Sequence, residues 1–119
     1  MIDIQRTFIW VRLPKSQQNV YAWVSGVLAV HERITETGAR VSPPWDVTHV
    51  PSGLLVCSAN TRDDGVRAME ALLVLDWASV KAGMGKRKQQ TFGNKVRNTL
   101  RALPGYDKAI WLNTQEGDS

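Results

Sequence analysis

Three residues close together in the chain have the types found in a hydrolase triad: Asp46, His49 and Ser52. If residues 45–50 form a strand, Asp46 and His49 point to opposite faces of the sheet, because side chains alternate along a strand. Ser52 follows a proline and fits a turn. We therefore interpret this set as turn chemistry, and we predict neither a catalytic residue nor an enzyme activity.

A second combination could bind a metal if it met on adjacent strands: His31, His49 and Cys57. These residues lack the paired-ligand spacing that zinc sites have in sequence. We expect His49 to be hydrogen-bonded within a sheet and Cys57 to be a small buried residue. The sequence predicts no metal.

The segment Gly83-Met84-Gly85-Lys86 is only superficially similar to a phosphate-binding loop. That loop needs a glycine where this chain has Val80, and a serine or threonine where it has Arg87. We therefore predict no nucleotide and no other cofactor.

The most pronounced chemical feature is a basic stretch between Lys81 and Arg101. It contains seven Lys and Arg and no acidic residue, although the whole chain has 15 basic and 11 acidic residues and a net charge of +4. Such a local excess of positive charge favours a polyanionic partner, namely nucleic acid, an acidic protein surface or anionic lipid.

Residues 88–103 predict a helix that carries this charge. On a helical wheel Phe92, Val96, Leu100 and Leu103 form a narrow apolar wedge, and the polar side has no acid. Cations neutralise phosphates, and asparagine adds hydrogen bonds to phosphates or base edges. The candidate binding residues are Lys86, Arg87, Lys88, Asn94, Lys95, Arg97, Asn98 and Arg101. The alternative is a solvated helix face that only maintains solubility.

The five tryptophans could include a platform on which bases stack. Trp77 and Trp111 lie in apolar patterns that favour the core. Trp10, Trp23 and Trp45 lie in predicted strands, where one of them could be exposed.

The first part of the chain predicts strands. Residues 7–13 are rich in aromatic and β-branched residues and stop at Pro14. Residues 20–34 fit both a helical stripe and a period-2 strand, and the β-branched content leads us to favour one long strand. Residues 35–40 predict a turn, and the pair Pro43-Pro44 predicts an extended connection.

The second part predicts a hairpin over residues 45–57, with Pro51 and Gly53 in its turn. Asn60 or Thr61 is then expected to cap a helix whose apolar stripe runs to Val80. After the basic helix, residues 109–112 form an edge strand or a packing tail, and residues 113–119 form a polar tail. The expected fold is a single α+β domain over residues 1–119. It has an antiparallel meander of about four strands, followed by two helices on one face.

The hairpin residues Trp45 to Leu54 and the following Thr61-Arg62-Asp63-Asp64 carry a resemblance. They resemble a segment of small uncharacterised proteins of phages and other mobile elements, with the pattern W-x-V-T-H-x-P-[S/T]-G-L before such a helix. The resemblance covers about 40 residues, roughly 45 to 80, and excludes the basic helix. The resemblance implies an accessory protein that binds host or viral machinery. No activity attaches to this pattern, so none is transferred to this chain.

Composition agrees with a folded protein inside the cell. The 43% apolar content can form a core, and a single cysteine excludes an internal disulfide framework. The N-terminus has no secretory signal pattern, and no apolar run is long enough to span a membrane. We therefore expect a cytoplasmic protein with no membrane contact.

These features predict a non-catalytic accessory protein of phage or mobile-element type that contacts nucleic acid through the basic helix. The alternative is a phage-encoded, anti-CRISPR-like inhibitor that docks on an acidic or nucleoprotein surface of a bacterial defence complex. An acidic mimic of DNA is excluded by the charge. DNA or RNA, strandedness and oligomeric state stay open, and an unpaired sheet edge would permit a homodimer.

Overall fold

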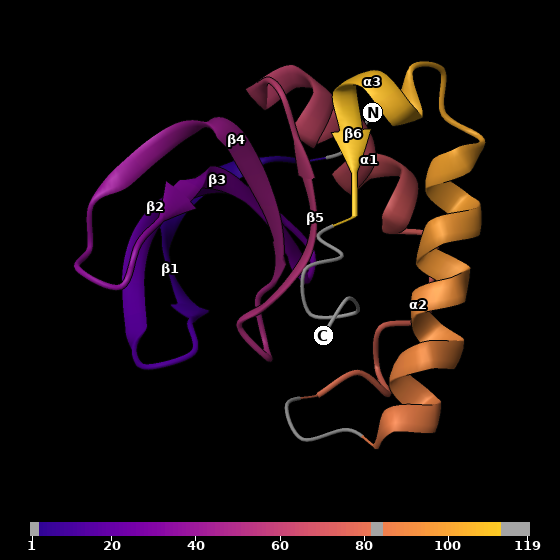
Figure 1. Ribbon diagram of the computed structural model, residues 1–119, viewed down its shortest axis with the longest axis horizontal. Coiled ribbons are helices and arrows are strands. Elements are labelled where there is room, and N and C mark those ends of the chain that lie inside the picture. The colour runs from indigo at the N-terminus through magenta and orange to yellow at the C-terminus, as the bar shows by residue number, and fades with distance from the viewer. Residues whose placement is uncertain (1–2, 82–84, 113–119) are drawn as a thin grey trace.

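Consecutive strands pair with one another in a meander, as the computed structural model shows for residues 3–81 and 85–112 (Figure 1). The described strands are β1 (Gln5–Arg12), β2 (Gln17–Ser25), β3 (Leu28–Ile34), β4 (Arg40–His49), β5 (Leu54–Ala59) and β6 (Ile110–Trp111). The helices are α1 (Arg62–Leu72), α2 (Lys86–Arg101) and the short α3 (Tyr106–Ala109). The chain forms a single α+β domain with an antiparallel sheet and its helices on one side, as the sequence predicts.

The sheet has six strands in the described part of the chain, where about four were expected. The prediction of one long strand over residues 20–34 is wrong, because the chain turns at Gly26 and Val27 and forms the β2–β3 hairpin. Ser25 pairs with Leu28 across this two-residue turn, and Gly26 has a positive φ of 57°. A glycine in the first position of such a turn matches the twist of the two strands. Of the two alternatives for residues 109–112, the edge strand is confirmed in part, because Ile110–Trp111 form β6 and pair with β5.

The predicted hairpin over residues 45–57 is confirmed as β4 and β5, with Gly53 at a φ of 74° in the turn. The predicted turn over residues 35–40 is also present, between β3 and β4. Pro43 and Pro44 belong to β4 itself, so they extend a strand and not a separate connection.

The sheet bends strongly, so that β1 returns towards the β4–β5 turn (Figure 1). The backbone N–H of Arg12 donates to the carbonyl oxygen of Gly53 at 2.8 Å and ties the two segments together. The bend creates two hydrophobic cores on opposite sides of the sheet. The inner core lies within the bend and contains Ile9, Val11, Val20, Ala22, Ala29 and Ile34.

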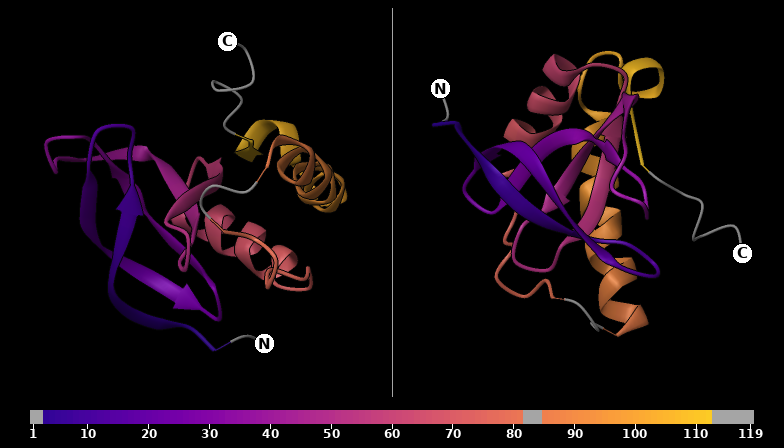
Figure 2. Two further views of the ribbon diagram at one scale, coloured as in Figure 1. Left: turned by 90° about the horizontal axis from the view of Figure 1, so that it is seen from below. Right: turned by 90° about the vertical axis from the view of Figure 1, so that its left-hand side faces the viewer.

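The helix-side core lies between the sheet and the helices. Its buried residues are Leu28, Val30, Val47, Cys57, Ala59, Ala68, Met69, Leu72, Trp77, Val96, Leu100 and Ile110. Helix α1 packs across β3, β4 and β5, and α2 packs against α1 and α3 (Figure 2). The sheet and helix layers thus enclose the helix-side core, and β1 and β2 lie beyond the cover of α2 (Figure 2).

Helix α1 begins where the sequence predicts, because Thr61 Oγ1 accepts the backbone N–H of Asp64 at 3.1 Å. It ends earlier than predicted, at Leu72. The indole N–H of Trp77 donates to the carbonyl oxygen of Leu72 at 2.8 Å and satisfies one of the helix-end acceptors. Trp77 and Val80 of the predicted stripe still pack in or against the helix-side core, but they do so from the loop that follows the helix.

Helix α2 covers residues 86–101, two residues earlier at each end than the predicted range. The predicted polar tail over residues 113–119 lies outside the described residues, as do residues 82–84. No helix within the described ranges is both long and apolar enough to cross a membrane.

Candidate nucleic-acid interface

All eight predicted binding residues belong to α2, and the helix presents them to solvent. The exposed ones are Lys86, Arg87, Lys88, Asn94, Lys95, Asn98 and Arg101, and Arg97 is half-buried. Lys86, Arg87 and Lys88 form the first turn, whereas Lys95 and Arg101 lie further along the helix. The structure therefore gathers the predicted cations on one element.

The apolar wedge of α2 is inside the protein, as the wheel predicts. Val96 and Leu100 are buried in the helix-side core. Phe92 packs edge-on against Trp77, with ring centroids 4.7 Å apart. This packing fixes the rotation of α2 about its axis and turns the cationic side outward.

The cations of α2 have no acidic partner among the side chains that the structure describes. The ion pairs there involve Arg33, Arg40, Arg62 and Arg67, none of which belongs to α2. Within α2, Arg97 Nη1 donates to Asn94 Oδ1 at 2.8 Å, which uses the amide oxygen but leaves the positive charge uncompensated.

The two long helices begin in opposite ways. Helix α1 has a side-chain cap at Thr61 and two acids, Asp63 and Asp64, in its first turn. Helix α2 has Gly85 at its N-cap, no side-chain cap and no acid in its first turn. Three cations there face the positive end of the helix dipole, which is unfavourable for the helix.

The hydrolase-like residues do not assemble into a triad. His49 Nδ1 and Ser52 Oγ are hydrogen-bonded at 2.8 Å, but Ser52 Oγ also accepts the N–H of Leu54 at 3.2 Å, as a turn residue does. Asp46 lies on the other side of the sheet, with Arg33 Nη2 at 3.0 Å and Ser58 Oγ at 2.7 Å from its Oδ1. This network holds β3, β4 and β5 together within the bend.

A hollow of about 470 Å³ lies beside His49, which stacks on Trp77 with ring centroids 5.2 Å apart. Asp76 also lines it, but no described contact joins this carboxylate to His49. Burial lowers the pKa of His49. Among the described residues His49 thus lacks the acid that would orient it as a catalytic base.

The residues considered for a metal lie on different sides of the sheet. His31 lies in the bend, where Nε2 is hydrogen-bonded to Thr48 Oγ1 at 2.7 Å and Nδ1 to the carbonyl oxygen of Glu32 at 2.7 Å. Burial lowers the pKa of His31. Cys57 belongs to the helix-side core, and burial raises the pKa of its thiol. Both ring nitrogens of His31 are therefore engaged, and Cys57 is a buried thiol.

Of the three tryptophans in the predicted strands, the exposed one is Trp10. Trp10 and Phe8 of β1 are 60% and 61% exposed, whereas Trp77 is buried in the core. Phe8 continues a row of rings in contact: Trp45 to Trp23 at 5.7 Å, Trp23 to Tyr21 at 6.4 Å, and Tyr21 to Phe8 at 5.1 Å between centroids. The signal in the sequence was the alternation of β1, where every second residue from Arg6 to Arg12 is aromatic or basic.

Comparison of the chain with family models, with curated proteins and with solved structures gave no match.

Proposed function

We propose that this protein is a non-catalytic nucleic-acid-binding protein whose phosphate contacts come from α2. The observation that carries the proposal is the cationic side of this helix, which has no acidic partner among the described side chains. Phosphates bound to Lys and Arg release condensed counterions, and this release is the main source of affinity for such a surface.

The first turn of α2 supports the same reading. Lys86, Arg87 and Lys88 stand at the positive end of the helix dipole, where acids would stabilise the helix, as Asp63 and Asp64 do in α1. Positions that break a local folding rule without a structural gain are often functional. A bound phosphate would compensate both the cations and the uncapped N–H groups.

The mobile-element setting is proposed from the resemblance of residues 45–54 and 61–64 alone. It suggests that the nucleic acid is that of a phage, a mobile element or a bacterial host.

The test is binding to labelled single- and double-stranded DNA and RNA across a salt series. If all six cations contact phosphates, the logarithm of the affinity should fall with the logarithm of salt with a slope of about −4 for a single strand and about −5 for a duplex. Exchanging Lys95 and Arg101 for glutamate removes two exposed cations, and the slope should then become shallower by about 1.4 for a single strand and about 1.8 for a duplex.

The matched control is the pair Lys15→Glu and Arg40→Glu. These residues are also exposed and change the net charge equally, but they lie in the β1–β2 turn and in β4. If both pairs weaken binding to the same extent, only the net charge matters and α2 is not the interface. If no binding appears even at low salt, the proposal fails; stable co-purification with a bacterial complex would then support the inhibitor.

A further inference from the structure

The outer face of β1–β2 combines aromatic and basic side chains. We define it by the residues that point away from the inner core, which the register pairs as Arg6 with Trp23, Phe8 with Tyr21, Trp10 with Asn19, and Arg12 with Gln17. None of these eight residues is acidic. On β1 the order is arginine, phenylalanine, tryptophan, arginine, with Ile9 and Val11 buried on the other side.

Neither exposed ring, Phe8 or Trp10, belongs to either hydrophobic core. Ile9 and Val11 already anchor β1 to the inner core. Phe8 gains one ring contact, with Tyr21, and no described aromatic ring contacts Trp10. More than half of each side chain remains in water, and contiguous exposed apolar surface of this kind usually marks an interaction site.

The cover of the helices ends at the border of this face. The guanidinium of Arg62, at the start of α1, lies 5.1 Å from the ring centroid of Trp23. Beyond it, Tyr21, Phe8 and Trp10 are exposed. Arg62 and Trp23 thus form a cation–π contact at the border of the outer face.

The charges beside the rings select the partner. Arg6 and Arg12 flank the aromatic pair along β1, and no described ion pair neutralises either of them. Flat apolar groups between cations complement a chain of flat bases with phosphates between them. Alternate residues of a strand are about 6.7 Å apart. Neighbouring bases in a duplex are stacked about 3.4 Å apart, so Phe8 and Trp10 are too widely spaced to contact two such bases.

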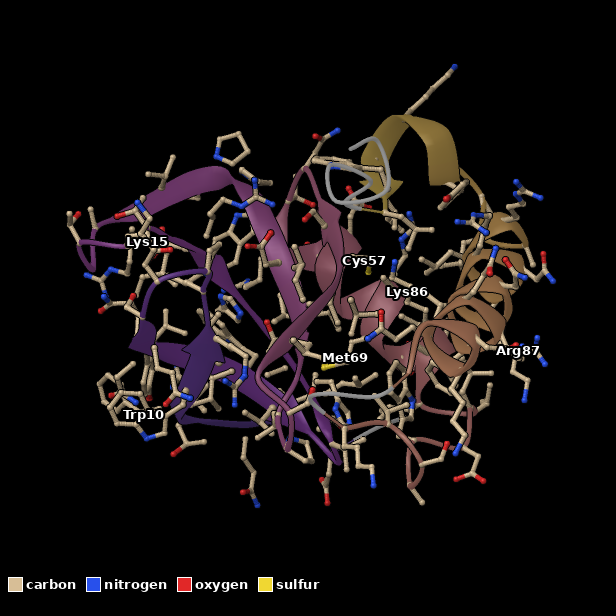
Figure 3. All side chains as sticks on the ribbon, turned by 60° about the horizontal axis from the view of Figure 1, so that its bottom comes forward. Trp10, Lys15, Cys57, Met69, Lys86 and Arg87 are labelled. Carbon is tan, nitrogen blue, oxygen red and sulfur yellow. The ribbon has the colours of Figure 1, made fainter. Side chains whose placement is uncertain are left out.

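We propose that the outer face of β1–β2 is a second nucleic-acid surface, on which bases of a single strand stack on Phe8 and Trp10 while Arg6 and Arg12 contact phosphates. Trp10 lies on the opposite side of the molecule from Arg87 (Figure 3). This inference extends the proposed function to single strands, but it stands on a separate surface and can be tested apart from α2.

The experiment compares an oligothymidylate with an abasic oligomer of the same length, at a salt concentration that weakens phosphate contacts. Stacking needs bases, so the native protein should prefer the oligothymidylate. Trp10→Ala should lower affinity for it by roughly fivefold or more, the effect of losing one stacked base, and should leave affinity for the abasic oligomer almost unchanged. Trp10→Phe keeps a ring and should retain most of the preference.

The α2 variant Lys95→Glu with Arg101→Glu separates the two proposals. This variant should bind both oligomers more weakly, by a similar factor, and should still prefer the oligothymidylate to the abasic oligomer. If it has no effect while Trp10→Ala does, the proposal for α2 fails and the stacking surface stands. Equal affinity of the native protein for the two oligomers would overturn the stacking proposal. So would a dimer that dissociates on Trp10→Ala without a change in that preference, because the face would then serve self-association.

Discussion

Replacing Gly65 by alanine tests how closely α1 is seated on β3. A Cβ atom at Gly65 would lie 2.9 Å from Val30 Cγ1, 3.7 Å from Val30 Cγ2 and 3.9 Å from Trp45 Cβ. The first distance is well inside the optimal separation of about 3.5–4.0 Å between carbon atoms. Val30 is fully buried and its χ1 angle is stiff, so the overlap is not relieved by a simple rotation.

Two opposing effects determine the free energy of unfolding of the Gly65→Ala variant. Alanine in a helix is more favourable than glycine by about 1 kcal/mol. Overpacking of a tight core costs about 1–3 kcal/mol. We expect the overlap to dominate, so the variant should be less stable than the native protein by about 1 kcal/mol.

In a Val30→Ala background, the effect of Gly65→Ala on the free energy of unfolding should change sign. Removing the two methyl groups of Val30 destabilises the protein by itself, by about 2 kcal/mol. It also removes both atoms that the new Cβ would meet first. In this background Gly65→Ala keeps its helical advantage and partly fills the space, so it should stabilise the protein by about 1 kcal/mol.

Urea denaturation of the four proteins in this double-mutant cycle measures the coupling. The expected coupling is about 2 kcal/mol, the difference between a loss of about 1 in the native background and a gain of about 1 without Val30. Additive effects, or a Gly65→Ala variant that is more stable in both backgrounds, would refute the packing of α1 on β3 described above.

Two further predictions concern buried titratable groups. The pKa values of His31 and His49 are lowered by burial, so below a pH of about 6.5 the unfolded chain binds protons that the folded protein does not. The free energy of unfolding should therefore decrease as the pH falls from about 7.5 to about 5.5, by up to about 1.4 kcal/mol per pH unit for each histidine, as urea denaturation would measure. The thiol of Cys57 is buried and its pKa is raised, so a thiol reagent should modify it at the rate at which the native protein opens.

Both the histidine prediction and the Cys57 prediction can be contradicted by the same measurements. A free energy of unfolding that stays constant over this pH range in the native protein would show that neither histidine is shielded from protonation. Modification of Cys57 in the native protein as fast as in urea would show that β5 does not lie under the helices. Cys57→Ser provides the control for reaction at other groups.

The sequence predicted the elements whose ends are marked by local chemistry. Gly53 marks the β4–β5 turn, and Thr61 with its following acids marks the start of α1. Val96 and Leu100 define the buried side of α2, so the exposure of its cations followed from periodicity. These signals act within a few residues of one another, which is why they can be read without knowing the fold.

What the sequence did not resolve depended on contacts between distant residues. Residues 20–34 were compatible with a helix or one long strand, and neither pattern predicted the turn at Gly26 that the pairing of Ser25 with Leu28 establishes. Trp77 continues the helical stripe of α1, but its indole N–H bonds to Leu72 and the helix stops. In both places a tertiary contact overrides the local pattern.

Which strand tryptophan is exposed could not be decided from the sequence for a similar reason. Both sides of β1 are apolar, with Ile9 and Val11 on one and Phe8 and Trp10 on the other. Alternation shows that the two sets point in opposite directions, but only the bend of the sheet decides which set is enclosed. The larger rings remain outside, and the smaller β-branched residues fill the inner core.

The order of the strands in the meander also suggests an order in which the elements fold. Strands β1 to β5 pair with their neighbours through short turns, so each hairpin closes a small loop and can form quickly. The last pairing is different, because the helical segment separates Ala59 from its partner Ile110 in the chain. Closing a loop of that length has a larger entropic penalty. The pairing of only two residues of β6 with β5 offsets little of this penalty. We expect the five-stranded unit to form first and the segment that carries α2 to dock last. The same segment should then be the first to exchange its amide hydrogens when the native protein opens.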